Sequence, residues 1–444
     1  MLVIVGGGPA PGTAQREAVR RACRADADAR LLGALPAAAR VIGVGRDAAL
    51  LGAAYRQLHR GAAWCVAERL DAVTPAMLEG VDLVVLADGV EHLADPLPAL
   101  RLLAAHTSGQ AQLVACARNA AQAELLGRLV EADLTTLPAD AWSDDAVRRD
   151  SPASLFKLLM DAGWMPHLAA HTTRPTRLLP AVHSLADAMG VPRRTFERTL
   201  GIDWMIVEAR KPFGPALVET ALAAAAFSVV VPTTRESQIR VNVEASPGLQ
   251  EVGARIVSVR GAKDPGDALM RSRDHCDTDW VLLCHQDVYF PAGFGRQLNA
   301  LLDAIPADER ARTLIGFAGM GANLQANRCE PAGFVIDRTS RFDHPVSAAA
   351  VSIDELAIVI ARDSLHRIDP ALGWHLWATD LCLTAITRHR IFPRLVRLPL
   401  FHNSSNDYVL PESFHRAAAT LAAKHAGFGA IHTLCGVIDA PAAA

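Results

Sequence analysis

The chain has 444 residues, which is long for one ordinary hydrophobic core, so the length favours two domains and leaves three open. Hydrophobic residues make up 51% and charged residues 20% of the chain. This composition excludes large-scale disorder, because enough apolar side chains exist to form sizeable cores. The net charge of −3 disfavours nucleic acid as a partner.

The cysteines and the N-terminal residues indicate the cellular compartment of the protein. The eight cysteines are scattered without a C-x-x-C pair, which is typical of reduced core residues in a cytoplasmic protein. No basic segment precedes the first apolar run, and no apolar stretch approaches the length of a membrane span. We therefore expect a cytoplasmic protein without a transmembrane segment. A homo-oligomer is left open.

The first residues contain VIVGGGPAPG, which raises the question of a dinucleotide-binding domain and thus of an oxidoreductase. Gly6 and Gly8 fit the pattern G-x-G-x-x-G, but Pro11 holds the third glycine position. The following REAVRRACRADADARLL predicts a helix and no second strand with an acidic end. A strand end followed by a flexible turn is the better interpretation, and an oxidoreductase is kept as the weakest alternative.

Short apolar runs alternate with amphipathic segments along the chain, which predicts an α/β fold with largely parallel sheets. A Pro/Gly-containing connector at residues 211–226 separates two halves, so we place the domains at 1–215 and 216–444. Helices are expected around residues 120–130 and 154–162. Strands are expected at residues 1–5, 39–45, 62–68, 81–88, 111–117 and 203–210, and then at 227–233, 254–261, 279–290, 313–321, 333–338, 352–362 and 394–402.

The first half contains DLVVLADGVEHLADP, followed by a predicted helix and AQLVACARNAA, and further on SPASLFKLLMDAGWMPHL. This order resembles class I S-adenosylmethionine (SAM)-dependent methyltransferases over residues 38–210, where a strand ends in a turn carrying Glu-His-Leu. The resemblance implies a Rossmann-like, methyltransferase-type domain. The short connection from AAWCVAE to DLVVL leaves little room for that family's third strand and adenine pocket.

The family's cofactor motif, acid-x-Gly-x-Gly-x-Gly, is degenerate in this chain. Gly43 falls at the acidic position and Gly45 at the first glycine, while Asp47 and Ala49 replace the other two. Asp47 would bring a Cβ and a negative charge against the methionine part of SAM. Glu68 lies where the family keeps the carboxylate that holds the ribose hydroxyls. SAM binding is therefore expected to be weak or absent, and the alternatives are a scaffold and an active methyltransferase with an unusual loop.

The second half contains WVLLCHQDVYFP, in which an apolar strand ends in a carboxylate. An unpaired charge at a sheet end is costly, so this Asp needs a partner. A divalent cation bridging phosphates is the usual partner at the carboxyl end of such a strand. An N-cap or turn aspartate is the alternative.

Three further stretches follow in order: SIDELAIVIARDS, GWHLWATDLCLTA and LFHNSSND. Together with HQDV, they resemble the inverting family 2 glycosyltransferases of the GT-A fold over residues 227–430, in the subgroup where HQDV replaces Asp-x-Asp. The resemblance implies an α/β GT-A domain, a nucleotide-diphosphate sugar as donor, and Mn²⁺ or Mg²⁺ as cofactor. The acceptor is an unknown glycan, lipid-linked or protein hydroxyl.

The same resemblance assigns residue roles. Asp287 and His402 would hold the metal, and a histidine ligand favours manganese. Asp380 would be the general base that takes the acceptor proton. The other residues implied in nucleotide-sugar or acceptor binding are Thr233, His285, Asp354, Glu355, Trp374 and His375.

The main functional expectation is therefore a metal-dependent glycosyltransferase. A bifunctional glycosyltransferase and SAM-dependent methyltransferase is the first alternative. The second is a non-catalytic assembly subunit. The structural alternative for Asp380 is a helix-start carboxylate, and ordinary packing is the alternative for Trp374 and Trp377.

Overall fold

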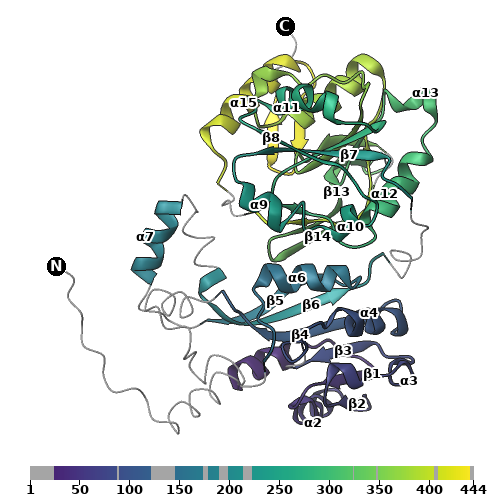
Figure 1. Cartoon of the computed structure of the whole chain (residues 1–444), viewed down its shortest axis with the longest axis vertical. Coiled ribbons are helices and arrows are strands. Elements are labelled where there is room, and N and C mark those ends of the chain that lie inside the picture. The colour runs from purple at the N-terminus through teal and green to yellow at the C-terminus, as the bar shows by residue number, and fades with distance from the viewer. Residues whose placement is uncertain are drawn as a thin grey trace, which may run out of the picture. The chain divides into compact units, whose positions relative to one another are not determined.

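The computed structural model divides into two compact units, Met1–Lys211 and Pro212–Ala444, here called unit 1 and unit 2 (Figure 1). The structure describes residues 25–87, 90–121, 146–173, 179–189, 199–213, 223–323, 325–346, 349–404 and 409–440. The stretch VIVGGGPAPG, the strand expected at 1–5 and nearly all of the helix expected at 120–130 lie outside these residues. Both units are mixed α/β, as the sequence predicts.

Unit 1 is built on a sheet with the strand order β2-β1-β3-β4-β6-β5. Strands β2, β1, β3 and β4 are parallel, and β6 runs antiparallel to both β4 and β5. Strands β1, β3, β4 and β6 are mostly buried, whereas the edge strands β2 and β5 are partly exposed. Their bounds are β1 Arg40–Val44, β2 Ala63–Ala67, β3 Leu83–Leu86, β4 Gln112–Arg118, β5 Met165–Thr173 and β6 Ile202–Arg210.

Helices connect these strands, and their apolar faces pack on the sheet. The short link between β2 and β3 holds only the 3-10 turn η1 (Leu70–Ala72) and the one-turn helix α3 (Pro75–Leu78). No third parallel strand forms there, so β2 is an edge strand, as the length of the link predicts. The other helices are α2 Ala48–Leu58, α4 Leu97–His106, α6 Pro152–Asp161 and α7 Leu179–Met189.

Unit 2 contains a first sheet with the order β17-β11-β16-β9-β7-β8. Strands β8, β7 and β9 are parallel, while β16 is antiparallel to both of its neighbours. The central strands are apolar along their length because both faces of the sheet are buried. The bounds are β7 Phe227–Thr233, β8 Ile256–Arg260, β9 Trp280–Cys284, β11 Leu314–Gly316, β16 Ala357–Ala361 and β17 Arg394–Leu395.

A second sheet in unit 2 has the order β10-β18-β13-β12-β15, with β14 paired to β13. Its pairs are antiparallel except for β13 with β18, so the expectation of largely parallel sheets is wrong for this part. Short hairpin links, such as the turn between β13 and β14, permit antiparallel neighbours. The bounds are β10 Val288–Tyr289, β12 Ala318–Asn323, β13 Arg328–Asp337, β14 Ser340–His344, β15 Ala350–Ile353 and β18 Phe401–His402.

Helices cover the sheets of unit 2, and a hairpin of β19 (Ala430–Thr433) and β20 (Gly436–Asp439) follows the last helix. The two helices that matter for the site are α14, Trp377–Thr384, and α15, Glu412–Lys424. The others are α9 Glu236–Val241, α10 Pro247–Gln250, α11 Pro265–Ser272, α12 Phe294–Asp303 and α13 Ala307–Arg310. In the part of the chain that is described, no helix has both the length and the apolar character needed to cross a membrane.

Candidate functional site

The candidate site of unit 2 starts where β9 ends. The strand is buried throughout, and the chain leaves it at His285, whose backbone N–H donates to the carbonyl of Leu356 (2.9 Å). Asp287 follows two residues later, just before β10, and its carbonyl accepts from the backbone N–H of Asn403 (2.8 Å). These backbone bonds fix a three-residue loop between two neighbouring segments of unit 2.

Gln286, between these two residues, anchors the loop to the end of β7. Its side-chain Oε1 accepts hydrogen bonds from Thr233 Oγ1 (2.9 Å), the Thr234 N–H (3.0 Å) and the Arg235 N–H (3.0 Å). Sequence reasoning missed this role, although an amide is well suited to satisfying several donors at a strand end. Thr233, expected to bind a nucleotide, is buried and bonded to Gln286, so the two strand ends are tied together.

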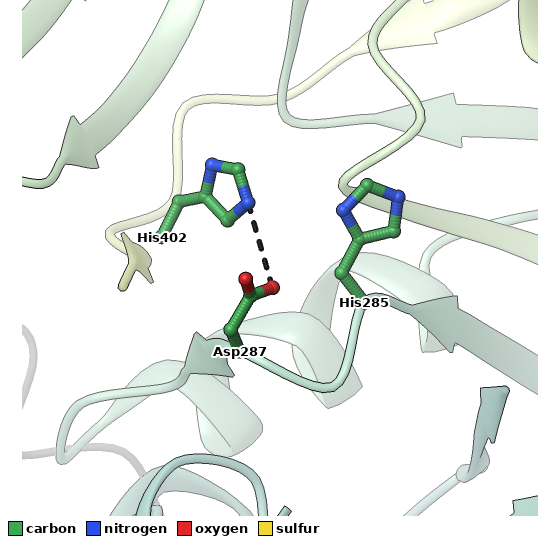
Figure 2. A group of neighbouring side chains, drawn as sticks. All are labelled: His285, Asp287 and His402. Carbon is green, nitrogen blue, oxygen red and sulfur yellow. Dashed lines mark ion pairs between the residues drawn. The ribbon is translucent and has the colours of Figure 1, made fainter. Parts of the chain in front are cut away.

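His402 comes to the site from β18, which pairs with β10 so that His402 lies opposite Val288. Its Nε2 is 3.5 Å from Asp287 Oδ1, and its Nδ1 is 3.0 Å from Asp337 Oδ1. The imidazole therefore lies between two carboxylates. Figure 2 shows the rings of His402 and His285 on either side of the Asp287 carboxylate.

The local charges favour the ionised carboxylate. Burial alone would raise the pKa of Asp287, but its hydrogen bond and charge interaction with His402 outweigh burial and lower this pKa to about 2. Burial would likewise lower the pKa of His402, but Asp287 and Asp337 raise it to about 10. Desolvation by the surrounding protein lowers the pKa of His285, although this residue is partly open to solvent.

These three side chains can serve a cation together. One ligand atom from each of His285, Asp287 and His402 lies within 4.8 Å of the other two. Two imidazole nitrogens and one carboxylate oxygen form a donor set for first-row divalent metals, and nitrogen ligands favour manganese over magnesium. The donor set thus matches the metal residues expected from the sequence and adds His285.

Asp354 and Glu355 lie in the loop between β15 and β16. Asp354 Oδ1 accepts from the Leu356 N–H (3.1 Å), and the Asp354 charge acts on the pKa of His285. Glu355 points to the start of α14, where its Oε1 accepts from the Ala378 N–H (3.4 Å). Burial, with a contribution from Asp354, raises the pKa of Glu355 well above its usual range. Glu355 thus caps a helix, whereas the Asp354 charge acts on His285 of the cluster.

Trp374 and His375 occupy the turn before α14. The Trp374 side chain is 42% exposed, which leaves its ring open to a ligand. His375 Nε2 is 3.0 Å from Ser413 Oγ on α15, and burial lowers the pKa of His375. His375 also acts on the pKa of His285, so this turn lies near the cluster in unit 2.

Asp380, expected as a general base, is buried on α14 with only 1% of its side chain exposed. Its Oδ2 lies 2.9 Å from Lys424 Nζ and its Oδ1 lies 2.8 Å from His425 Nε2. Both carboxylate oxygens therefore have partners from α15 and the residue after it. This is the geometry of an internal ion pair that joins two helices, and it does not present an oxygen to an acceptor hydroxyl.

In unit 1, the residues assigned to a degenerate SAM motif surround the ends of β1 and β2. Gly45 has a φ of 118°, which favours glycine, and its N–H donates to the Ala67 carbonyl (2.9 Å). Glu68 is exposed and follows β2 directly. Asp47 is the N-cap residue of α2. The turn and the carboxylate thus lie at neighbouring strand ends.

Gly43 has a packing reason of its own. It lies inside β1, and a Cβ there would be 2.6 Å from Cζ2 of Trp64 on β2. Gly52 of α2 is equally close, because a Cβ there would be 2.5 Å from Trp64 Nε1. The two glycines make room for one indole between strand and helix, so Gly43 needs no ligand to explain it.

Comparisons with known proteins bear on unit 1. A SAM-dependent methyltransferase from Archaeoglobus fulgidus is 13% identical, covers 44% of this chain and 94% of its own, and has a TM-score of 0.29. Human N-acetylserotonin methyltransferase in complex with SAM is 14% identical, covers 45% of this chain and 56% of its own, and has a TM-score of 0.27. These low scores carry no argument by themselves. The strand order and the antiparallel β6 are what give unit 1 its Rossmann-like, methyltransferase-type fold.

No known protein family matches the sequence. No characterised protein matches it either. The two solved structures named above are methyltransferases, and the prediction that the protein is a glycosyltransferase is contradicted at its expected general base, because both carboxylate oxygens of Asp380 are paired internally. Short motifs such as HQDV and TDLCL carried that prediction. In the structure, Gln286 of the first ties two strand ends together and Asp380 of the second is paired internally.

Proposed function

We propose that unit 2 binds one divalent cation at His285, Asp287 and His402 and, through that cation, the phosphate groups of a ligand. The observation that carries the proposal is the position of His402, whose Nε2 faces the ionised Asp287 while Nδ1 is held by Asp337. The ligand class expected from the sequence, a nucleotide-diphosphate sugar, offers such phosphates. Manganese is the preferred ion because two of the three ligands are imidazoles.

The cation would supply positive charge for the phosphate oxygens, and on binding Nε2 it would displace the proton that His402 otherwise carries. Three protein ligands leave coordination positions for oxygens of the bound ligand. Asp354 and His375, the neighbour of Trp374, both act on the pKa of His285. Asp354 and Trp374 are open in part, so they are the side chains proposed to contact the rest of the ligand. Exposed aromatic rings pack well on the apolar face of a sugar.

The experiment is calorimetry of the full chain with uridine diphosphate and with inorganic pyrophosphate, each with Mn²⁺ and with a chelator. Binding of either probe is expected with Mn²⁺ and is expected to be lost with the chelator. Equal affinity under both conditions would contradict a cation-mediated site. So would the absence of binding under both.

Unit 1 supports a second candidate function, SAM binding in a methyltransferase-type domain. The specific observation is that the Gly45 N–H, after β1, bonds to the carbonyl of Ala67, and Glu68 follows Ala67 at the end of β2. Sheets of this class bind nucleosides at the carboxyl ends of such strands. Glu68 would accept hydrogen bonds from the ribose hydroxyls, and Gly45 would let the backbone approach the cofactor. Methyl transfer to an unidentified acceptor is the activity proposed for this unit.

Two variants in unit 1 should change SAM affinity in opposite directions. Glu68→Ala should weaken it about 10-fold or more, because hydrogen bonds to a charged group contribute roughly 1.5–3 kcal/mol. Asp47→Gly should strengthen it about 10-fold, because it removes a carboxylate from the turn below the methionine part of SAM. The side chain of Asp47 makes no cap hydrogen bond, so helix α2 should tolerate the change.

Fluorescence-detected binding of S-adenosylhomocysteine to the full chain measures both effects, with Glu79→Ala as the matched control. Glu79 is also exposed in unit 1 but lies after α3, away from these strand ends. If wild type and Asp47→Gly both fail to bind, unit 1 is a scaffold that has the fold without its ligand.

A further inference from the structure

A row of three side chains crosses three neighbouring strands of the second sheet in unit 2. Strand β18 lies between β10 and β13. The antiparallel pairing of β10 with β18 places Val288, the residue after Asp287, opposite His402. The parallel pairing of β13 with β18 places Asp337 directly beside His402. The register of the sheet therefore puts His402 between two carboxylates.

The two ring nitrogens of His402 have different partners. Nδ1 lies 3.0 Å from Asp337 Oδ1, a hydrogen-bond distance, whereas Nε2 lies 3.5 Å from Asp287 Oδ1. With the Nδ1 proton donated to Asp337, a cation bound at Nε2 takes the place of the proton that His402 otherwise shares with Asp287. Nε2 faces Asp287 and the ring of His285, whose centroid is 5.7 Å from that of His402. A carboxylate behind a histidine orients metal-binding imidazoles in this way.

The backbone holds Asp337 at this position from both sides. The turn between β13 and β14 contains Arg338, which has a φ of 55°, an uncommon conformation for a residue other than glycine. The Arg338 N–H donates to the His402 carbonyl (3.0 Å), and its Nε donates to the Ser404 carbonyl (3.2 Å). On the other side of Asp337, the Ile336 N–H donates to the Leu400 carbonyl (2.9 Å), so the hairpin is fixed to the chain before and after His402.

We propose that Asp337 is a positioning residue for the cation site, because it fixes the ring orientation of His402 and keeps Nε2 available as the metal ligand. The inference rests on the function proposed for unit 2 and adds a residue that the sequence motifs do not contain. Asp337 does not touch the cation itself. Its effect is expected on affinity and on ligand geometry, with the fold left intact.

Asp337→Ala should weaken Mn²⁺ binding to the full chain by about 10-fold to 100-fold, the usual effect of losing the carboxylate behind a metal-binding histidine. Asp337→Asn keeps the shape and loses the charge, so a smaller loss is expected. The matched control is Asp343→Ala, on β14 of the same hairpin, whose carboxylate pairs with Arg397. This control should bind Mn²⁺ with wild-type affinity.

A second measurement distinguishes the proposed orientation of the His402 ring by Asp337 from a purely structural role of Asp337. In wild-type protein saturated with Zn²⁺, ¹⁵N spectra of the His402 ring should show the proton on Nδ1, and in Asp337→Asn this signal should broaden or shift. Wild-type affinity and unchanged ring signals in both Asp337 variants would overturn the inference while leaving the cation site intact. Failure of the wild type to bind any cation would instead overturn the function proposed for unit 2, and this inference with it.

Discussion

Replacing Asp380 by asparagine should lower the free energy of unfolding of unit 2 by about 3 kcal/mol, because it breaks an internal ion pair by removing one partner. The side chain is 1% exposed and bonds both Lys424 and His425. In the variant, the Lys424 charge would lose one of its two carboxylates, and the His425 imidazole would lose the carboxylate with which it is paired. The expected loss is at the low end of the usual range, since Lys424 keeps Asp369 and is partly solvated.

Hydrogen exchange of the α14 amides in the native full chain reports on unit 2 alone and measures this change. The control is Asp369→Asn, which removes a partner of Lys424 that is 28% exposed and should cost less than about 1 kcal/mol. Equal protection in wild type and Asp380→Asn would show that the pair does not hold α14 to α15. The general-base role expected from the sequence predicts unchanged protection, so the two interpretations are distinguishable.

The same pair should make unit 2 sensitive to strongly alkaline pH. Burial alone would lower the pKa of Lys424, but hydrogen bonds to Asp369 and Asp380 outweigh it and raise this pKa. The folded state then keeps a proton that the unfolded state loses above about pH 10. The contribution of the pair is therefore complete below that pH and declines above it, and Asp380→Asn should show a smaller decline than wild type.

Asp287→Ala should reduce Mn²⁺ affinity by more than about 100-fold, because it removes the one anionic ligand of the cluster. Losing a residue that binds the cation directly should cost more affinity than losing a residue that only orients such a ligand. The carboxylate is held ionised by His402, so its negative charge is present throughout the neutral range. His402→Ala should have a similar effect. Asp343→Ala, which removes a carboxylate elsewhere in unit 2, should leave the affinity unchanged, and a comparable loss in that control would assign the effect to net charge.

The sequence predicted most strands of both units because their apolar runs are long and flanked by turns. It correctly anticipated that the link after Glu68 is too short for another strand. It did not predict β5, β14 or the hairpin β19–β20, and it expected one strand at 279–290 where the structure has β9 and β10. In β14, β19 and β20, polar and apolar residues alternate too briefly to form a pattern. Strand β10 pairs with β18, which is distant in the chain, and local periodicity does not contain such a pairing.

The candidate site was predictable only in part. The carboxylate after a buried strand and the late histidine pointed to a cation, and the fold brings Asp287 and His402 together. The role of Asp337 follows from the register of β13 with β18, which is a tertiary property. Asp380 was misassigned for the same reason, because its partners lie more than 40 residues later on another helix.

The most direct test of the cation site is a titration of the wild-type full chain with Mn²⁺, followed by the electron paramagnetic resonance signal of the free ion. We predict that one ion per chain is taken up, and that Asp287→Ala leaves the free-ion signal at the level seen without protein. Wild-type protein that leaves all the Mn²⁺ free, or that takes it up equally well without Asp287, would contradict the account.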